Sequence, residues 1–208
     1  MVTSTELRAR VAESFDGLGM PSWANPHPDG AQPRDEEYSR VTEPSRYDIV
    51  HARARAWTEH LGQQPGVRVE PIAPGENFDR GTKITSTRAG TLPLLLLEQD
   101  AEHAVLRVAV AEPELEIALL PDCGCDACDW GCDDLLAAVD DKIAMVVGGP
   151  FVVLRGKDWH AQWHPGGGSA GGGVDLGAMM ELCRRLAGGE DVDLPQGTEA
   201  FAGAGWFN

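Results

Sequence analysis

The sequence predicts an α+β protein, and three observations support that prediction. Apolar residues recur every three or four positions in both terminal parts of the chain, as on one face of a helix. Five short segments in the middle are rich in β-branched residues or leucine, and turn-forming residues separate them. Because no helical pattern lies between these segments, we expect a mainly antiparallel sheet built as a meander.

Two helices are expected in the N-terminal part of the chain. The first covers Thr3 to Leu18, where Thr3 and Glu6 match a capping box. The second follows Pro44 and ends at Gly62. The proline-rich stretch from Gly19 to Pro33 separates the two, and we expect no regular structure there.

The sheet and the central helix follow. The predicted strands are Val67 to Ile72, Thr82 to Thr87, Leu92 to Leu97, Ala104 to Ala111 and Leu115 to Leu120. A central helix beginning near Leu135 should end at Gly148 and Gly149. We expect Phe151 to Arg155 and Trp159 to Trp163 to form a hairpin that closes the sheet.

The C-terminal part begins with a glycine run. Gly166 to Gly173 contains six glycines in eight residues, which predicts a flexible connector. A last helix should follow, with Cys183 buried and inert on its apolar face. We expect one domain over residues 1–187, with a helical part at 1–61 and the sheet and cysteine loop at 62–187. The acidic tail at 188–208 either is loose or docks its aromatic end.

Charge and hydropathy narrow the classes of partner and compartment. The 208 residues include 33 acidic and 17 basic side chains, a formal charge of −16, which repels phosphate backbones and anionic lipid. We therefore expect neither nucleic acid nor a membrane as a partner, and the sequence identifies no other. The apolar stretches are far shorter than the roughly 20 residues of a membrane span, and the first fifteen residues do not resemble a secretory signal. These features predict a cytoplasmic protein.

Four cysteines form the sharpest chemical feature. Cys123, Cys125, Cys128 and Cys132 fall within ten positions between a predicted strand and the central helix. Thiolates bind soft or borderline cations, and the two-residue gap between Cys125 and Cys128 lets two sulfurs converge on one ion. Zinc is therefore the first candidate cofactor, and the four cysteines are its candidate ligands.

Other interpretations of the cysteine loop remain open. The spacing fits an iron–sulfur cluster less well than zinc. In a reducing compartment, Cys125 and Cys128 could form a transient disulfide. Five aspartates in and beside the loop oppose thiolate formation unless a metal or a helix terminus compensates. The loop could also be an ordered turn with no bound species.

Two histidines are less certain candidate ligands. His160 and His164 are four residues apart, so on a strand they share one face with Gln162, while Trp159 and Trp163 share the other. The alternative is a pair of solvent-facing histidines over a tryptophan-lined core. No comparable constellation surrounds the remaining histidines, His27, His51, His60 and His103.

Three segments resemble an uncharacterised family of actinobacterial proteins. They are C-G-C-D-A-C-D at residues 123–129, D-D-L-L at 133–136 and W-H-A-Q-W-H at 159–164, and the resemblance spans about residues 115–185. The family has no established activity, so the resemblance implies none. It does imply that Cys132 is often replaced by serine, which would leave Cys123, Cys125 and Cys128 as the core. The fourth ligand would then be a histidine, an aspartate or water.

Three hypotheses about function follow from these residues. The first is a cytosolic, non-catalytic module whose cysteine loop binds structural zinc. The second is a zinc-dependent enzyme such as a hydrolase, in which His160 or His164 handles protons near the metal. The third is a thiol redox or stress-sensing protein.

Overall fold

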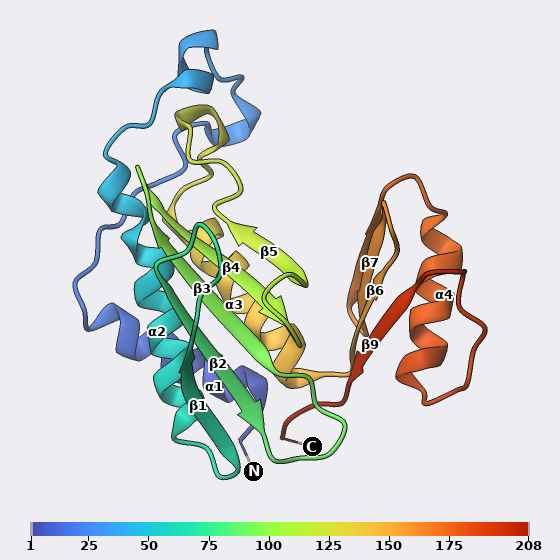
Figure 1. The fold of residues 1–208 in the computed structure, drawn as a ribbon. Helices are drawn as coiled ribbons and strands as arrows, with labels where there is room; N and C mark the ends of the chain where they lie inside the picture. Colours follow the sequence, from blue (N-terminus) through green and yellow to red (C-terminus); the bar gives the residue numbers. More distant parts are fainter. Residues whose placement is uncertain (1, 208) are drawn as a thin grey trace.

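The computed structural model describes residues 2–207, and within them it contains four α-helices and two antiparallel β-sheets (Figure 1). The predicted α+β class is therefore confirmed. The first sheet holds the predicted meander, in the spatial order β1-β2-β3-β4-β5. Its strands are β1 (Val67–Ile72), β2 (Arg80–Ser86), β3 (Leu94–Asp100), β4 (Ala104–Val110) and β5 (Glu116–Leu120).

Helices α2 (Ile49–Gly62) and α3 (Cys132–Gly148) pack against the first sheet, and α1 (Ser4–Asp16) packs on α2 and α3. The predicted capping box forms at the start of α1, where Thr3 accepts a hydrogen bond from the Glu6 backbone N–H and Glu6 accepts one from Thr3. Between Gly19 and Pro33 the regular structure is limited to the short 3-10 helix Pro28–Gly30, in line with its prolines.

A buried ion pair joins α2 to α3. Arg53 donates two hydrogen bonds to Asp140, at 2.8 and 2.6 Å, and the Trp57 indole N–H donates a third at 2.7 Å. Side chains of α1, α2, α3 and the first sheet surround this pair and form the main hydrophobic core. Because a buried carboxylate is costly unless its oxygens are paired, these contacts fix how α2 and α3 meet.

The C-terminal part forms a second sheet, which corrects the prediction of a hairpin closing the first. The hairpin itself is present, but its strands β6 (Phe151–Arg155) and β7 (His160–His164) pair with β8 (Gly167–Gly171) and β9 (Glu199–Gly203). The spatial order is β8-β7-β6-β9, and α4 (Leu176–Ala187) covers one face (Figure 1).

The prediction of a flexible connector in the glycine run was wrong, because β8 occupies most of it. The reason is steric. A Cβ on Gly168 would lie 2.3 Å from the Met180 sulfur and 2.5 Å from the Gln162 carbonyl oxygen. On Gly171 it would lie 2.8 Å from the His160 ring. The glycines therefore let β8 lie close under neighbouring side chains.

The end of the chain docks rather than hanging loose. Strand β9 pairs with β6, and Trp206 is only 4% exposed in the main core. The Trp206 backbone N–H donates to the Val147 carbonyl at the end of α3, at 2.9 Å. Phe151 and Val153 of β6 face that same core, so the two sheets share it. None of the described helices has the length and apolar character needed to cross a membrane.

Candidate metal centre

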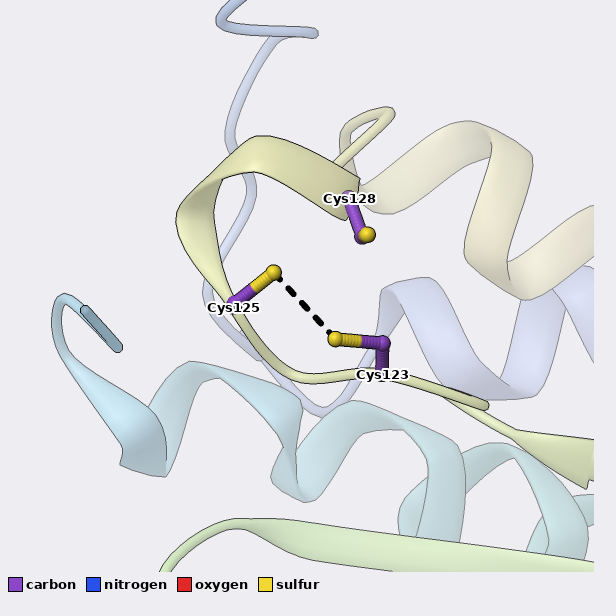
Figure 2. A group of neighbouring side chains, drawn as sticks. All are labelled: Cys123, Cys125 and Cys128. Atoms are coloured by element: carbon purple, nitrogen blue, oxygen red, sulfur yellow. Dashed lines mark hydrogen bonds between the residues drawn. The ribbon is translucent and has the colours of Figure 1, made fainter. Parts of the chain in front are cut away.

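Three thiols converge on the loop between β5 and α3. The ligand atoms of Cys123, Cys125 and Cys128 all lie within 4.8 Å of one another, and they form the only such group of potential metal ligands found in residues 2–207. Cys123 donates a hydrogen bond to the Cys125 sulfur at 3.2 Å, and the Cys128 sulfur faces the same space (Figure 2). Cys125 is buried, whereas Cys123 and Cys128 are exposed. The cluster is thus open to solvent on one side.

Asp126 anchors this loop to the N-terminal segment. Its carboxylate accepts hydrogen bonds from Arg40 Nε at 2.6 Å and from the hydroxyl and backbone N–H of Thr42, both at 2.7 Å. Its backbone N–H donates to the Arg40 carbonyl at 2.8 Å, and its own carbonyl accepts from His27 Nε2 at 3.1 Å. Burial alone would raise the pKa of Asp126, but the hydrogen bonds from Thr42 and Arg40 outweigh it and lower the pKa to about 2.

Asp129 forms a second anchor. It accepts hydrogen bonds from the Trp23 indole N–H, at 3.0 and 2.9 Å, and from the Gly131 backbone N–H at 2.8 Å. Arg46 lies 2.8 Å from the same carboxylate and stacks on the Trp23 and Tyr47 rings. Two of the loop aspartates are therefore occupied by partners from residues 23–46, and their charges are largely compensated.

The electrostatics make Cys125 easier to ionise than Cys128. Burial opposes its ionisation, but hydrogen bonds from Cys123, Cys128 and the backbone N–H groups of Cys128 and Ala127 lower the pKa of Cys125. Hydrogen bonding to Cys125 and burial raise the pKa of Cys128 to about 12, because it acts as a donor in that arrangement. Cys125 thus accepts hydrogen bonds from the neighbouring thiols, whereas Cys128 donates one.

Cys132 lies outside this cluster. It is the first residue of α3, which starts three residues before the predicted Leu135, and its backbone N–H donates to the Trp23 carbonyl at 3.1 Å. Its buried sulfur lies 3.3 Å from the Ser22 hydroxyl and donates to Asp133 at 3.3 Å. The four cysteines of the loop thus divide into a group of three and one residue that packs beneath the helix start.

His160 and His164 lie on β7 of the second sheet and do not join the thiols. Their predicted faces are confirmed: Trp159 and Trp163 pack against α4, and the histidines belong to the opposite face of the strand. The zinc-hydrolase hypothesis required one of these histidines beside the loop, and the structure does not bring either there.

Two other histidines do contact the loop, and the sequence analysis missed both. His27 donates to the Asp126 carbonyl. His103 lies against Gly124, where a Cβ would be 2.4 Å from its Nε2, and its ring packs on Tyr47 with centroids 5.5 Å apart. No local spacing could have revealed them, because their place depends on how β4 and the N-terminal segment pack. Gly124 is required at its position since His103 fills the space that a side chain would need.

The donor set fits zinc with three protein ligands. Tetrahedral zinc holds sulfurs at about 2.3 Å, which separates them from one another by about 3.8 Å. In the structure the three Sγ atoms lie within 4.8 Å of one another, close to that separation. A fourth ligand would come from the open side, where Cys123 and Cys128 border a cavity of about 190 Å³ that Tyr47 and Trp130 also line.

The fold and the loop define the class: an α+β protein of two antiparallel sheets with a preformed three-thiol cluster. The chain belongs to a family of unknown function, DUF6226, which matches residues 11–207. An uncharacterised family is what the loop and the W-H-A-Q-W-H segment predicted, and the match extends well beyond those segments. No curated protein and no solved structure matches the chain.

Proposed function

We propose that the protein is a non-catalytic module that binds one zinc ion reversibly through Cys123, Cys125 and Cys128. The convergence of three thiols on one loop carries this proposal. Thiolate ligands favour zinc over the harder cations magnesium and calcium. Solvent supplies the fourth ligand, since Cys132 is engaged with Ser22.

The two buried carboxylates of the loop are not available as a catalytic base. A catalytic zinc site needs a base that can take a proton from the metal-bound water. Asp126 and Asp129 are the buried carboxylates of the loop, and each is held by arginine and by further hydrogen-bond donors. Neither is free to accept that proton.

The anchors also support reversible rather than structural binding. In small zinc-dependent folds the metal orders the chain, so removing it unfolds the protein. Here Asp126 and Asp129 tie the loop to residues 23–46 through contacts that involve no sulfur. The loop therefore keeps its shape without the ion.

Metal analysis tests this proposal directly. Protein purified without an affinity metal should contain one zinc per chain, measured by mass spectrometry, and chelation should expose reactive thiols while the circular dichroism spectrum stays unchanged. Cys128→Ser should lose zinc, and Cys132→Ser, the matched control within the same loop, should retain it. Absence of zinc binding in the wild type would overturn the proposal, and unfolding on chelation would overturn its reversible form.

A redox role is the second candidate, and a specific contact favours it. Cys123 and Cys125 lie 3.2 Å apart, and Cys125 is the sulfur with the lowered pKa. Hydrogen peroxide would oxidise Cys125 to a sulfenic acid, which a neighbouring thiol converts to a disulfide with release of water. Mass spectrometry of peroxide-treated apo-protein should show loss of two hydrogen atoms, reversed by a dithiol. Overoxidised cysteine without that loss would exclude this role.

A further inference from the structure

A second site lies away from the thiols, where α3 faces the turn between β7 and β8. A cavity of about 720 Å³ opens there, and Lys142 and His164 both line it. Its volume falls within the range of small-molecule pockets. The start of α1 contributes Ser4, and Ala138, Met145 and Pro165 give part of the lining an apolar character.

Lys142 lines this cavity together with the Asp141 carboxylate, with which it forms no ion pair. Its side chain is half-buried, and within residues 2–207 it forms neither an ion pair nor a side-chain hydrogen bond. Its neighbour Asp141 is already paired with Arg8. The Lys142 ammonium is therefore available to a ligand that enters the cavity.

His164 adds a second donor. Its Nδ1 accepts a hydrogen bond from the Gly166 backbone N–H at 3.1 Å. An atom that accepts from a backbone N–H carries no proton, so the neutral ring carries its proton on Nε2. Burial and the charge of Lys142 lower the pKa of His164, while the charge of Asp141 opposes that shift. His164 therefore offers one N–H donor in the cavity that Lys142 also lines.

We propose that this cavity binds a small organic oxyanion, a carboxylate or a phosphate ester, through Lys142 and His164. Charge-assisted hydrogen bonds from an ammonium and an imidazole are the usual means of holding such groups, and the Ser4 hydroxyl is a further donor at the edge of the cavity. The apolar lining suits the carbon body of the ligand. The net charge of −16 opposes anions at long range, so the affinity has to arise from these local contacts.

Titration with two oxyanions tests the site. Inorganic phosphate and acetate are added separately to the full chain at constant ionic strength, and NMR follows the ring protons of His164 and the ε-protons of Lys142. We expect saturable shifts with at least one anion. Phosphate alone would indicate a phosphate ester, and acetate alone a carboxylate. Absence of a saturable shift with either would overturn the proposal.

Matched variants separate this site from general charge effects. Lys142→Gln should weaken binding by about tenfold or more, since it removes a charge-assisted contact. Lys157→Gln removes the same charge from an exposed position and should leave the affinity unchanged. Equal losses in both variants would refute a specific site. Lys142→Arg keeps the charge and should still bind, which distinguishes a lost contact from a misfolded variant.

Discussion

Replacing Asp126 by asparagine should loosen the thiol loop and lower the stability of the protein at neutral pH. Asparagine keeps the shape of the side chain but loses the charge that pairs with Arg40 at 2.6 Å. Either orientation of its amide also places an N–H₂ group against the donors Arg40 or Thr42. A buried donor facing another donor is costly, so the substitution is not conservative.

The pKa of Asp126 gives the magnitude of the effect. Lowering it from 3.8 to about 2 corresponds to about 2 kcal/mol of stability at neutral pH. The Arg40 side chain is 50% exposed, so solvent screens part of this interaction and we expect about 1 to 2 kcal/mol. The pKa of Asp126 is lower in the folded than in the unfolded state. Its contribution to stability is therefore present above pH 3.8 and is lost as the pH falls through about 2.

Urea unfolding of the wild type and of Asp126→Asn at pH 7 and pH 3 measures this contribution. The charge-dependent part of the difference in unfolding free energy between wild type and variant should fall by about half from pH 7 to pH 3. Asp122→Asn is the control, because Asp122 is an exposed aspartate of the same loop and its replacement should cost less than about 0.5 kcal/mol. The reasoning fails if Asp126→Asn costs no more than this control, or if its cost is the same at both pH values.

Three further predictions test other parts of the structure. Gly131→Ala should lower the melting temperature, at a cost of about 1 to 3 kcal/mol, because Gly131 has φ +93° and a Cβ would lie 2.7 Å from the Asn25 nitrogen. Gly168→Ala should cost about 1 to 3 kcal/mol in urea unfolding, since its Cβ would strike the Gln162 carbonyl oxygen, whereas a flexible connector would tolerate the change. Cys183 should react with thiol reagents only after unfolding, because the side chain is buried and burial raises its pKa to about 11. A labelling time course that shows rapid reaction in the native state would contradict this placement.

The first half of the fold was predictable because local patterns specify it. Thr3 and Glu6 mark the start of α1, and the five strand segments pair in sequence order, so neighbours along the chain are neighbours in space. The second sheet was not predictable in the same way. Gly166 to Gly173 has the composition of a linker. Part of it forms a strand by pairing with β7, and glycine is needed at Gly168 because β7 and α4 leave no room for a side chain there.

The candidate site was predictable in its sulfurs but not in its setting. The spacing of Cys123, Cys125 and Cys128 is local, and one turn of chain brings the three together. The direction of the Cys132 sulfur depends instead on the exact start of α3, which spacing does not specify. Arg40 and Trp23, which bind Asp126 and Asp129, lie some eighty or more residues earlier in the chain, so no local motif could predict these contacts.

The aspartates between the cysteines affect the thiols differently in the folded chain than composition suggests. By composition alone they oppose thiolate formation through like charge. In the structure Asp126 and Asp129 face away to Arg40 and Arg46, and the backbone N–H groups of the short turn that they hold point to the Cys125 sulfur. The same acidic residues that would oppose thiolate formation thus hold a turn that lowers the pKa of Cys125. Loop order and the proposed metal affinity should therefore respond differently to substitution. Asp126 and Asp129 substitutions should change both through the backbone, whereas cysteine substitutions should change only the proposed metal affinity.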